Sequence, residues 1–316
     1  MPLTNFPNGI FASPVVGADH FAGMWRGRVW FVDGTNGLNG NPGTDPTLAV
    51  QTLARAIALA SKDDTIYIRP QAVGVRYTEN VTVPVSTHAG LSIIGTGNGH
   101  GNSVYQACSF KGVTSVDAPV MILNSSYANV ENIHFYSNAA PTTNGFGVLM
   151  RWNTPVGLAL NIGSAIVNCS FTTNPDSPPA AGNAQAAIRM DSTEGQLVQG
   201  CFFEDCRVGI SVGSTQSAAY SIKILNNNFG GLAANIAADI YMTDVNIVDI
   251  NDNTFNHAVP THAAGSLTKY IYVAGTSTGC MGRNYQAASD VAKGTNNTLS
   301  NILASGNFGA GGPWTS

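Results

Sequence analysis

The segment Ser221-Ile-Lys-Ile-Leu-Asn-Asn-Asn-Phe229 decides the fold of this chain, because its shape recurs along the sequence. A run of alternating apolar and polar residues, typical of a half-buried strand, leads into a short polar turn that ends on an aromatic residue. Successive aromatic residues are separated by 23 to 36 positions, which indicates one repeat of about 28 residues with insertions. The aromatic residues that end the eight segments are Phe110, Phe135, Phe171, Phe202, Phe229, Phe255, Tyr285 and Phe308.

A repeat of this length predicts an all-β solenoid. We expect a single-stranded right-handed parallel β-helix, in which each coil pairs with the next at about 4.8 Å. Leucine-rich repeats would need a recurrent Leu-x-x-Leu-x-Leu motif, which is missing, and propeller blades need about 40 or more residues each. A β-sandwich or barrel with the aromatic residues in its core is the alternative that the pattern leaves open. In the β-helix, the eight rings would stack inside, and Asn-rich turns such as residues 226–228 would supply left-handed backbone conformations and stacked amides.

The composition agrees with a chain built from strands and turns. Of the 316 residues, 35 are glycine and only 10% are charged, which leaves little material for exposed helices. The net charge is −4, and the sequence contains no Lys/Arg cluster and no run of 18 apolar residues, so we expect neither a nucleic-acid nor a membrane partner. The N-terminus does not resemble a secretory signal peptide.

Five widely spaced cysteines predict buried thiols, reduced in a bacterial cytoplasm, rather than disulfides or a zinc site; they are Cys108, Cys169, Cys201, Cys206 and Cys280.

The N-terminal end of the β-helix needs a cover, since a solenoid exposes unpaired strand edges at its ends. Asp45 and Pro46 are typical of a helix start, and the apolar positions 49, 53, 56, 57 and 60 fall on one helical face. We therefore predict one amphipathic capping α-helix over residues 46–61. The predicted organisation is an N-terminal anchoring arm (1–27), a parallel β-helix (28–309) and a C-terminal tail (310–316).

The segment between positions 29 and 95 carries a resemblance to a known superfamily. Trp30-Phe-Val-Asp-Gly-Thr-Asn-Gly37, the expected helix, Asp64-Thr-Ile-Tyr-Ile-Arg-Pro70, Tyr77-Thr-Glu-Asn-Val-Thr-Val83 and Leu91-Ser-Ile-Ile-Gly95 resemble the entry segment of pectate-lyase-like right-handed β-helix proteins. With the coils, the resemblance covers about residues 28–309. That superfamily includes polysaccharide lyases, glycosidases and phage tailspikes, so the resemblance implies the fold and leaves the function open.

Two groups of acidic residues are candidates for chemistry. Glu204-Asp205 and Arg207, with Asp191 and Glu194 earlier in the chain, could form a glycosidase-like carboxylate pair if they shared an outer face; solvated turn residues are the alternative. A turn-bound Ca²⁺ and a pair of loop histidines are two further possibilities, although neither pattern has the spacing of an established metal motif. The residues concerned are Asp239, Asp244, Asp249 and Asp252 for calcium, and His257 and His262 for the histidine pair. We expect no catalytic site, no metal and no cofactor.

These observations predict a non-enzymatic structural protein of a bacteriophage particle, either a capsid decoration or a short fibre. The arm is similar to the short N-terminal arms of some phage virion proteins, and it would attach the chain to capsid or tail proteins; trimerisation is expected by analogy with phage β-helix appendages. The arm residues expected to contact the partner are Phe6, Pro7, Asn8, Ile10 and Phe11. The alternatives are a tailspike-like polysaccharide depolymerase and a host-glycan-binding protein. Any such contact would use the loops at 137–163, which contain Trp152, and 172–187.

Overall fold

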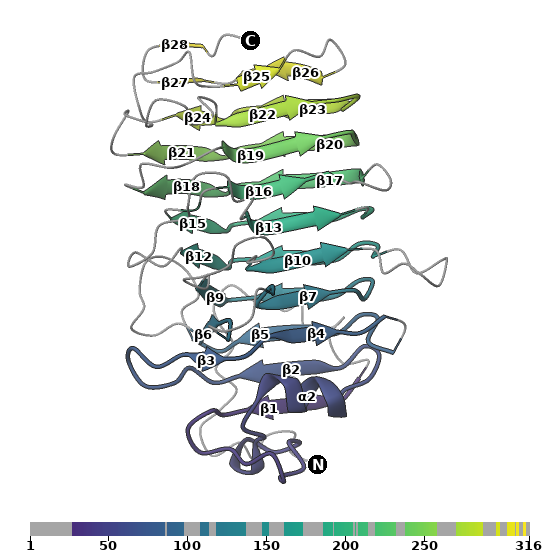
Figure 1. Cartoon of the computed structure of the whole chain (residues 1–316), viewed down its shortest axis with the longest axis vertical. Helices are drawn as coiled ribbons and strands as arrows, with labels where there is room; N and C mark the ends of the chain where they lie inside the picture. Colours follow the sequence, from purple (N-terminus) through teal and green to yellow (C-terminus); the bar gives the residue numbers. More distant parts are fainter. Residues whose placement is uncertain are drawn as a thin grey trace, which may run out of the picture.

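The computed structural model is a right-handed parallel β-helix whose coils stack from the N-terminal to the C-terminal end (Figure 1). The predicted all-β parallel β-helix is therefore confirmed. A typical coil contributes one short strand to each of three sheets, named sheet A, sheet B and sheet C in the order in which the chain visits them. The structure describes residues 27–85, 87–97, 108–113, 118–136, 147–151, 161–172, 186–191, 193–204, 206, 208–213, 219–231, 238–257, 270–286, 295–297, 302–306, 308–309 and 312–313.

The strands of each sheet follow one another in chain order, each pairing in parallel with its equivalents one coil away. Sheet A contains β1 (Val29–Val32), β2 (Thr65–Ile68), β5 (Ser92–Gly95), β8 (Asn129–Glu131), β11 (Ala165–Val167), β14 (Leu197–Gln199), β17 (Ala219–Leu225), β20 (Val245–Asn251), β23 (Gly279–Gly282) and β26 (Ile302–Ser305). Sheet B contains β3 (Tyr77–Thr78), β6 (Cys108–Lys111), β9 (Ile133–Tyr136), β12 (Ser170–Thr172), β15 (Phe202–Glu204), β18 (Asn228–Gly231), β21 (Thr254–His257), β24 (Tyr285–Gln286), β27 (Phe308–Gly309) and β28 (Gly312–Pro313). Sheet C contains β4 (Val81–Val83), β7 (Met121–Leu123), β10 (Val148–Arg151), β13 (Ala186–Asp191), β16 (Val208–Val212), β19 (Ala238–Thr243), β22 (Ile271–Ala274) and β25 (Thr295–Asn297). The pair β27–β28 is antiparallel, so the predicted C-terminal tail adds a short strand to sheet B.

A column of phenylalanine rings fills the core behind sheet B. Neighbouring rings along the column lie 4.6 to 6.5 Å apart between centroids. Offset stacking at such distances adds to the free energy gained by burying the rings. Tyr77 stacks on the first ring, and Tyr270 lies against the last. The column consists of Phe110, Phe135, Phe171, Phe203, Phe229 and Phe255.

The predicted column is wrong at two of its eight positions. Phe203, not Phe202, pairs with Phe229, and Phe202 faces outward. Tyr285 pairs with Thr254 rather than with Phe255, which leaves the tyrosine 49% exposed. Because side chains alternate between the faces of a strand, a slip of one residue moves an aromatic ring from the core to the surface. The backbone of Phe308 pairs with that of Tyr285, and its side chain lies outside the described part of the structure.

The turn from sheet A to sheet B is built from one left-handed residue followed by one buried residue. The left-handed residue has φ between 51° and 64° in successive coils, and it is Asn132, Asn168, Gly200, Asn226, Asp252 or Arg283. Next to it, Oδ1 of Asn253 accepts hydrogen bonds from the backbone and side-chain N–H groups of Asn227, both at 3.0 Å. Oδ1 of Asn284 accepts the same two bonds from Asn253 at 3.1 and 3.0 Å. The predicted left-handed turns and stacked amides are therefore confirmed.

Cysteines occupy the same buried turn position in earlier coils. The thiols of Cys169 and Cys201 each lie 3.6 Å from a backbone carbonyl oxygen of the preceding coil. Burial raises the pKa of Cys201 to about 12, so this thiol stays protonated. Four cysteines are buried free thiols, as predicted, but Cys280 is exposed on the outer face of sheet A.

The N-terminal cap differs from the single helix that we predicted over residues 46–61. A 3₁₀ turn, η1 (Pro46–Leu48), is followed by a separate helix, α2 (Leu53–Leu59), with Thr52 as its N-cap. Between them Val50 forms a parallel bridge to Val32 of β1, and a residue held in that extended pairing cannot continue a helix. The predicted apolar stripe is nevertheless buried, and Figure 1 shows α2 covering the first coils.

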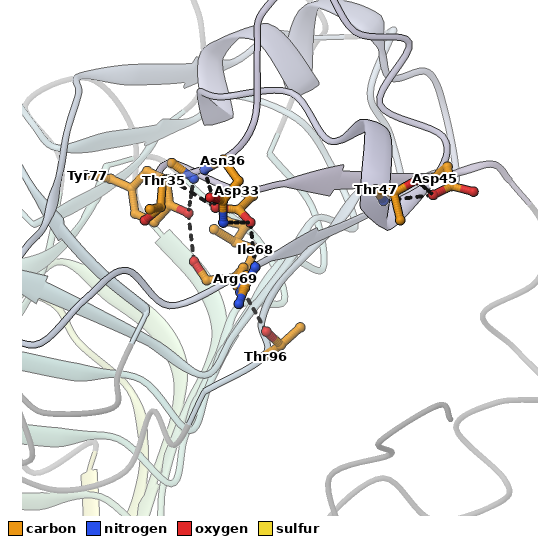
Figure 2. A network of polar contacts seen from close by, with 10 residues as sticks. Asp33, Thr35, Asn36, Asp45, Thr47, Ile68, Arg69, Tyr77 and Thr96 are labelled. Atoms are coloured by element: carbon orange, nitrogen blue, oxygen red, sulfur yellow. Dashed lines mark hydrogen bonds and ion pairs between the residues drawn. The ribbon is translucent and has the colours of Figure 1, made fainter. Parts of the chain in front are cut away.

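A polar network ties the first coils together (Figure 2). Asp33 accepts hydrogen bonds from the backbone of Thr35 and Asn36, and it pairs with Arg69 at 2.8 Å. Burial raises the pKa of Asp33, but these donors outweigh it and lower the pKa below its usual value. In the described part of the chain, no helix has the length and apolar character needed to cross a membrane.

Candidate functional site

The two aromatic rings that leave the core belong to one outward-facing row on sheet B. By backbone pairing, Phe202 lies beside Asn228, Asn228 beside Thr254, and Thr254 beside Tyr285. The row therefore places an amide and a hydroxyl between two aromatic side chains. Its strands β15, β18, β21 and β24 follow one another along one side of the molecule (Figure 1). Because successive coils are about 4.8 Å apart, the three steps from Phe202 to Tyr285 span about 14 Å along the molecule.

An open groove of about 320 Å³ lies along this row. We call it the sheet B groove, and its lining residues are Cys201, Phe202, Asn226, Asn227, Asn228, Asp252 and Thr254. The side-chain Oδ1 of Asn228 is buried and has no hydrogen-bond partner within the part of the chain that the structure describes. An unpaired buried acceptor is costly, so this atom is suited to receive a hydrogen bond from a bound molecule.

The left-handed turn residues form one edge of the groove. Arg283 donates two hydrogen bonds to the carboxylate of Asp252, both at 2.7 Å, from Nε and from an Nη atom. These bonds lower the pKa of Asp252, so the carboxylate is charged at neutral pH. The Arg283 side chain is 69% exposed, and Asn226 of the same turn column is also exposed. The edge therefore presents amide, carboxylate and guanidinium groups at the rim of an aromatic floor.

This combination of groups suits a polyhydroxylated ligand. The face of an aromatic ring packs against C–H-rich surfaces, and sugar rings offer such surfaces together with peripheral hydroxyls. Amide, hydroxyl and carboxylate groups supply both donors and acceptors for those hydroxyls. A few polar groups around an apolar floor are typical of sites for small ligands, and the volume lies within the range of such sites.

The structure separates most of the acidic residues that we singled out from the sequence. Asp191 lies in sheet C and pairs with Arg189 at 2.8 Å, whereas Glu194 is exposed at the turn between sheets C and A. Glu204 lies in β15, two residues beyond Phe202, and therefore on the same outer face as the groove. The predicted partners Asp205 and Arg207 lie outside the described residues. Glu204 is thus the member of the predicted carboxylate group that the described structure places beside the groove.

The second acidic stretch is also dispersed. Asp239 is buried in sheet C, Asp244 accepts hydrogen bonds from Thr276 at a turn, and Asp249 lies in sheet A. Asp252 reaches the groove. Within the described ranges, no three His, Cys, Asp or Glu residues form a group that could hold a metal ion.

Several residues that we singled out from the sequence lie outside the described part of the chain. Of the histidine pair, they include the side chain of His257 and the whole of His262. They also include Trp152 of the expected contact loop and the arm residues Phe6, Pro7, Asn8, Ile10 and Phe11. Conversely, our sequence reasoning missed the groove, because it assigned Phe202 and Tyr285 to the core. Aligning the repeats on the left-handed turn residue places both rings one position before the core column, but only the structure shows which residue of each turn is left-handed.

Comparison with known proteins extends the fold assignment. No family model and no curated protein matches the sequence. Among solved structures, the chain is similar to the native GH136 lacto-N-biosidase from Eubacterium ramulus, with a TM-score of 0.64 and 14% identity over 89% of this chain. It is also similar to the deglycosylated pectin methylesterase from Aspergillus niger, with a TM-score of 0.54 and 15% identity over 90% of this chain and 88% of that one. The chain spans 56% of the length of the lacto-N-biosidase.

These neighbours correct one prediction. The chain was expected not to be an enzyme, yet the structures that it resembles are enzymes. At such low identity the likeness shows the fold alone, a parallel β-helix that carbohydrate-active enzymes use. The predicted role in a phage particle stays a prediction.

Proposed function

We propose that this protein binds a linear carbohydrate along the sheet B groove. The observation that carries the proposal is the outward row of Phe202, Asn228, Thr254 and Tyr285, two aromatic platforms with hydrogen-bonding groups between them. One sugar ring would stack on Phe202 in the groove, and a later unit of the same chain would reach Tyr285. Solved structures that share the fold include a lacto-N-biosidase and a pectin methylesterase, which supports a carbohydrate as the ligand class.

Cleavage of the bound glycan is a separate question that the same groove raises. Hydrolysis of a glycosidic bond commonly uses two carboxyl groups about 5–9.5 Å apart. Glu204 lies on the groove face, and Asp252 lies in the groove with both carboxylate oxygens bonded to Arg283. Incubation with glycans that bind should therefore be followed for released oligosaccharides, in the wild type and in Glu204→Gln.

The binding proposal is tested with a glycan array followed by calorimetry. Phe202→Ala and Tyr285→Ala should each weaken binding of a glycan hit by at least about tenfold, because each removes one aromatic platform. Tyr220→Ala is the matched control, since Tyr220 is a 45% exposed aromatic residue in β17 of sheet A. Equal affinity in all three variants, or no binding across a broad panel of bacterial surface glycans, would refute the proposal.

We propose further that this binding serves a phage particle, with host surface glycan as the ligand. The support is the resemblance of residues 28–309 to a superfamily that includes phage tailspikes, together with the apolar character of the arm at 1–27. Arm residues such as Phe6 and Ile10 would attach the chain to capsid or tail proteins. Mass spectrometry of purified particles should find the chain at a stoichiometry that matches symmetry-related sites, and its absence from particles would refute this setting.

A further inference from the structure

The outward row that forms the groove continues toward the N-terminus as four polar residues. Each directly precedes an aromatic residue of the core: Arg76 before Tyr77, and Ser109, His134 and Ser170 before a phenylalanine. Backbone pairing confirms the alignment, because Tyr77 pairs with Phe110, Ser109 with His134, and His134 with Ser170. Ser170 in turn pairs with Phe202, so the four residues, here called the polar row, run directly into the groove.

Three of the four residues of the polar row are buried, and some of its polar atoms are unpaired among the described residues. Ser109, His134 and Ser170 are 3%, 1% and 1% exposed, although they lie on the outer face of the sheet. Among the described residues, three of its buried atoms have no hydrogen-bond partner, namely Nε of Arg76, Oγ of Ser109 and Nε2 of His134. Buried polar atoms without partners are rare in folded proteins, and each one costs stability. Three of them on consecutive rungs of one row form a set of groups suited to pair with a bound molecule.

All three of these atoms can act as donors. Nδ1 of His134 lies 2.6 Å from Oγ of Ser170, a separation that fits a hydroxyl donor better than a ring N–H donor. With Ser170 donating to Nδ1, the imidazole carries its proton on Nε2, directed away from Ser170. Nε of Arg76 is always a donor, and the hydroxyl of Ser109 can be one. A ligand that satisfies the row must therefore accept hydrogen bonds.

The charges around the row favour a negative ligand. The guanidinium of Arg76 lies 4.1 Å above the Tyr136 ring, and none of the ion pairs between described residues includes Arg76. Lys111, which pairs with Tyr136 in the next outward row, adds a second positive charge. The carboxylate of Glu79 is occupied elsewhere, by the backbone N–H groups of Leu53 and Ala54. Burial and the charge of Arg76 lower the pKa of His134 to about 4, which also places Arg76 within electrostatic reach of the imidazole.

We propose that Arg76, Ser109 and His134 form a binding site for an oxyanion, such as a carboxylate. A water molecule accepts at most two hydrogen bonds, so it would leave one donor unpaired, whereas a carboxylate accepts about four and carries the charge that complements Arg76. Arg76 and Tyr136 are only partly buried and mark the side on which the anion enters. Because the row continues into the sheet B groove, we identify the anion as the acidic group of a charged polysaccharide; this identification rests on the proposed function.

The test follows the ring signals of His134 by NMR in the full-length wild-type protein. Of the six histidines, His134 is assigned by the signal that disappears in His134→Gln. Acetate, phosphate, a uronate-containing oligosaccharide and its carboxyl-reduced neutral counterpart are titrated separately. An anion at Nε2 stabilises the imidazolium, so the pKa of His134 should rise when an anion binds. Arg76→Gln should weaken that binding at least about tenfold, whereas Arg55→Gln, which removes the same charge from an exposed position of helix α2, should not.

The outcomes separate this inference from the proposed function. A response to the uronate oligosaccharide that is stronger than the response to acetate supports the acidic glycan as the source. If the pKa of His134 rises only with acetate or phosphate, the anion site is supported and its assignment to a glycan is overturned. No response to any anion, while a neutral glycan still binds the groove, overturns the site and leaves the proposed function standing. If Arg76→Gln fails to fold, the comparison of the wild-type pKa with and without anion still decides.

Discussion

Phe202 and Phe203 are adjacent residues that the structure assigns to opposite faces, which makes them a matched pair for testing the register. Phe203 is 2% exposed and stacks between Phe171 and Phe229, with centroid distances of 5.1 and 4.6 Å. Removing a buried phenylalanine side chain from a core costs about 3–5 kcal/mol, and the total stability of a domain is only about 5–15 kcal/mol. Phe203→Ala should therefore lower the free energy of unfolding by about 3–5 kcal/mol, and the effect should spread to neighbouring coils because each coil depends on the next.

Phe202→Ala removes the same atoms from the other face. Its ring is half-buried on the floor of the groove and lies outside the core column. We expect a loss of about 1 kcal/mol or less, together with loss of glycan binding. Urea denaturation followed by circular dichroism measures the stability difference, and hydrogen exchange locates the affected coils, since a solenoid need not unfold in one step. If Phe202→Ala costs as much as Phe203→Ala, the assignment of faces in β15 is wrong.

Three further changes test other parts of the structure. Asn253→Ala removes the hydrogen bonds that the buried Asn253 side chain makes with Asn227, Asn284 and the carbonyl of Ile224, and it should cost about 2–4 kcal/mol in thermal or urea unfolding; a neutral result would refute a structural role for the amide ladder. The pKa of His134 is about 4 in the folded protein, against 6.5 for an ordinary histidine. Between these pH values the unfolded chain therefore binds a proton that the folded chain does not. Stability should therefore fall by roughly 3 kcal/mol as the pH decreases from about 6.5 to 4, and His134→Gln should flatten this part of the pH profile. Ile247 is 63% exposed with φ of 60°, a strained conformation for a β-branched residue, so Ile247→Gly should raise the melting temperature slightly, and a clear decrease would contradict the strain.

The cap and the site show where sequence reasoning stopped. The apolar stripe from Ala49 to Ala60 is buried as expected, but the pairing of Val50 with Val32 breaks the expected helix into η1 and α2. The bridge forms because strand β1 passes beside Val50 in space, and helix propensity contains no information about such a neighbour.

The groove was missed for a related reason. From the sequence alone, Phe202 and Phe203 look equally suited to the core, and Tyr285 looks suited to it as well. The pairing of neighbouring coils assigns Phe202 and Tyr285 to the surface.

The sequence by itself determined the winding of this chain, because a repeat of strand, left-handed turn and aromatic residue can be buried only by stacking one coil on another. It also determined the amide ladder, since Asn at the turn recurs at the same place in successive repeats. Only the tertiary structure decided which aromatic side chain of each coil lies inside, and therefore which ones form the groove. Strand side chains alternate at every residue, so a shift of one position, invisible in composition and spacing, exchanges core for surface.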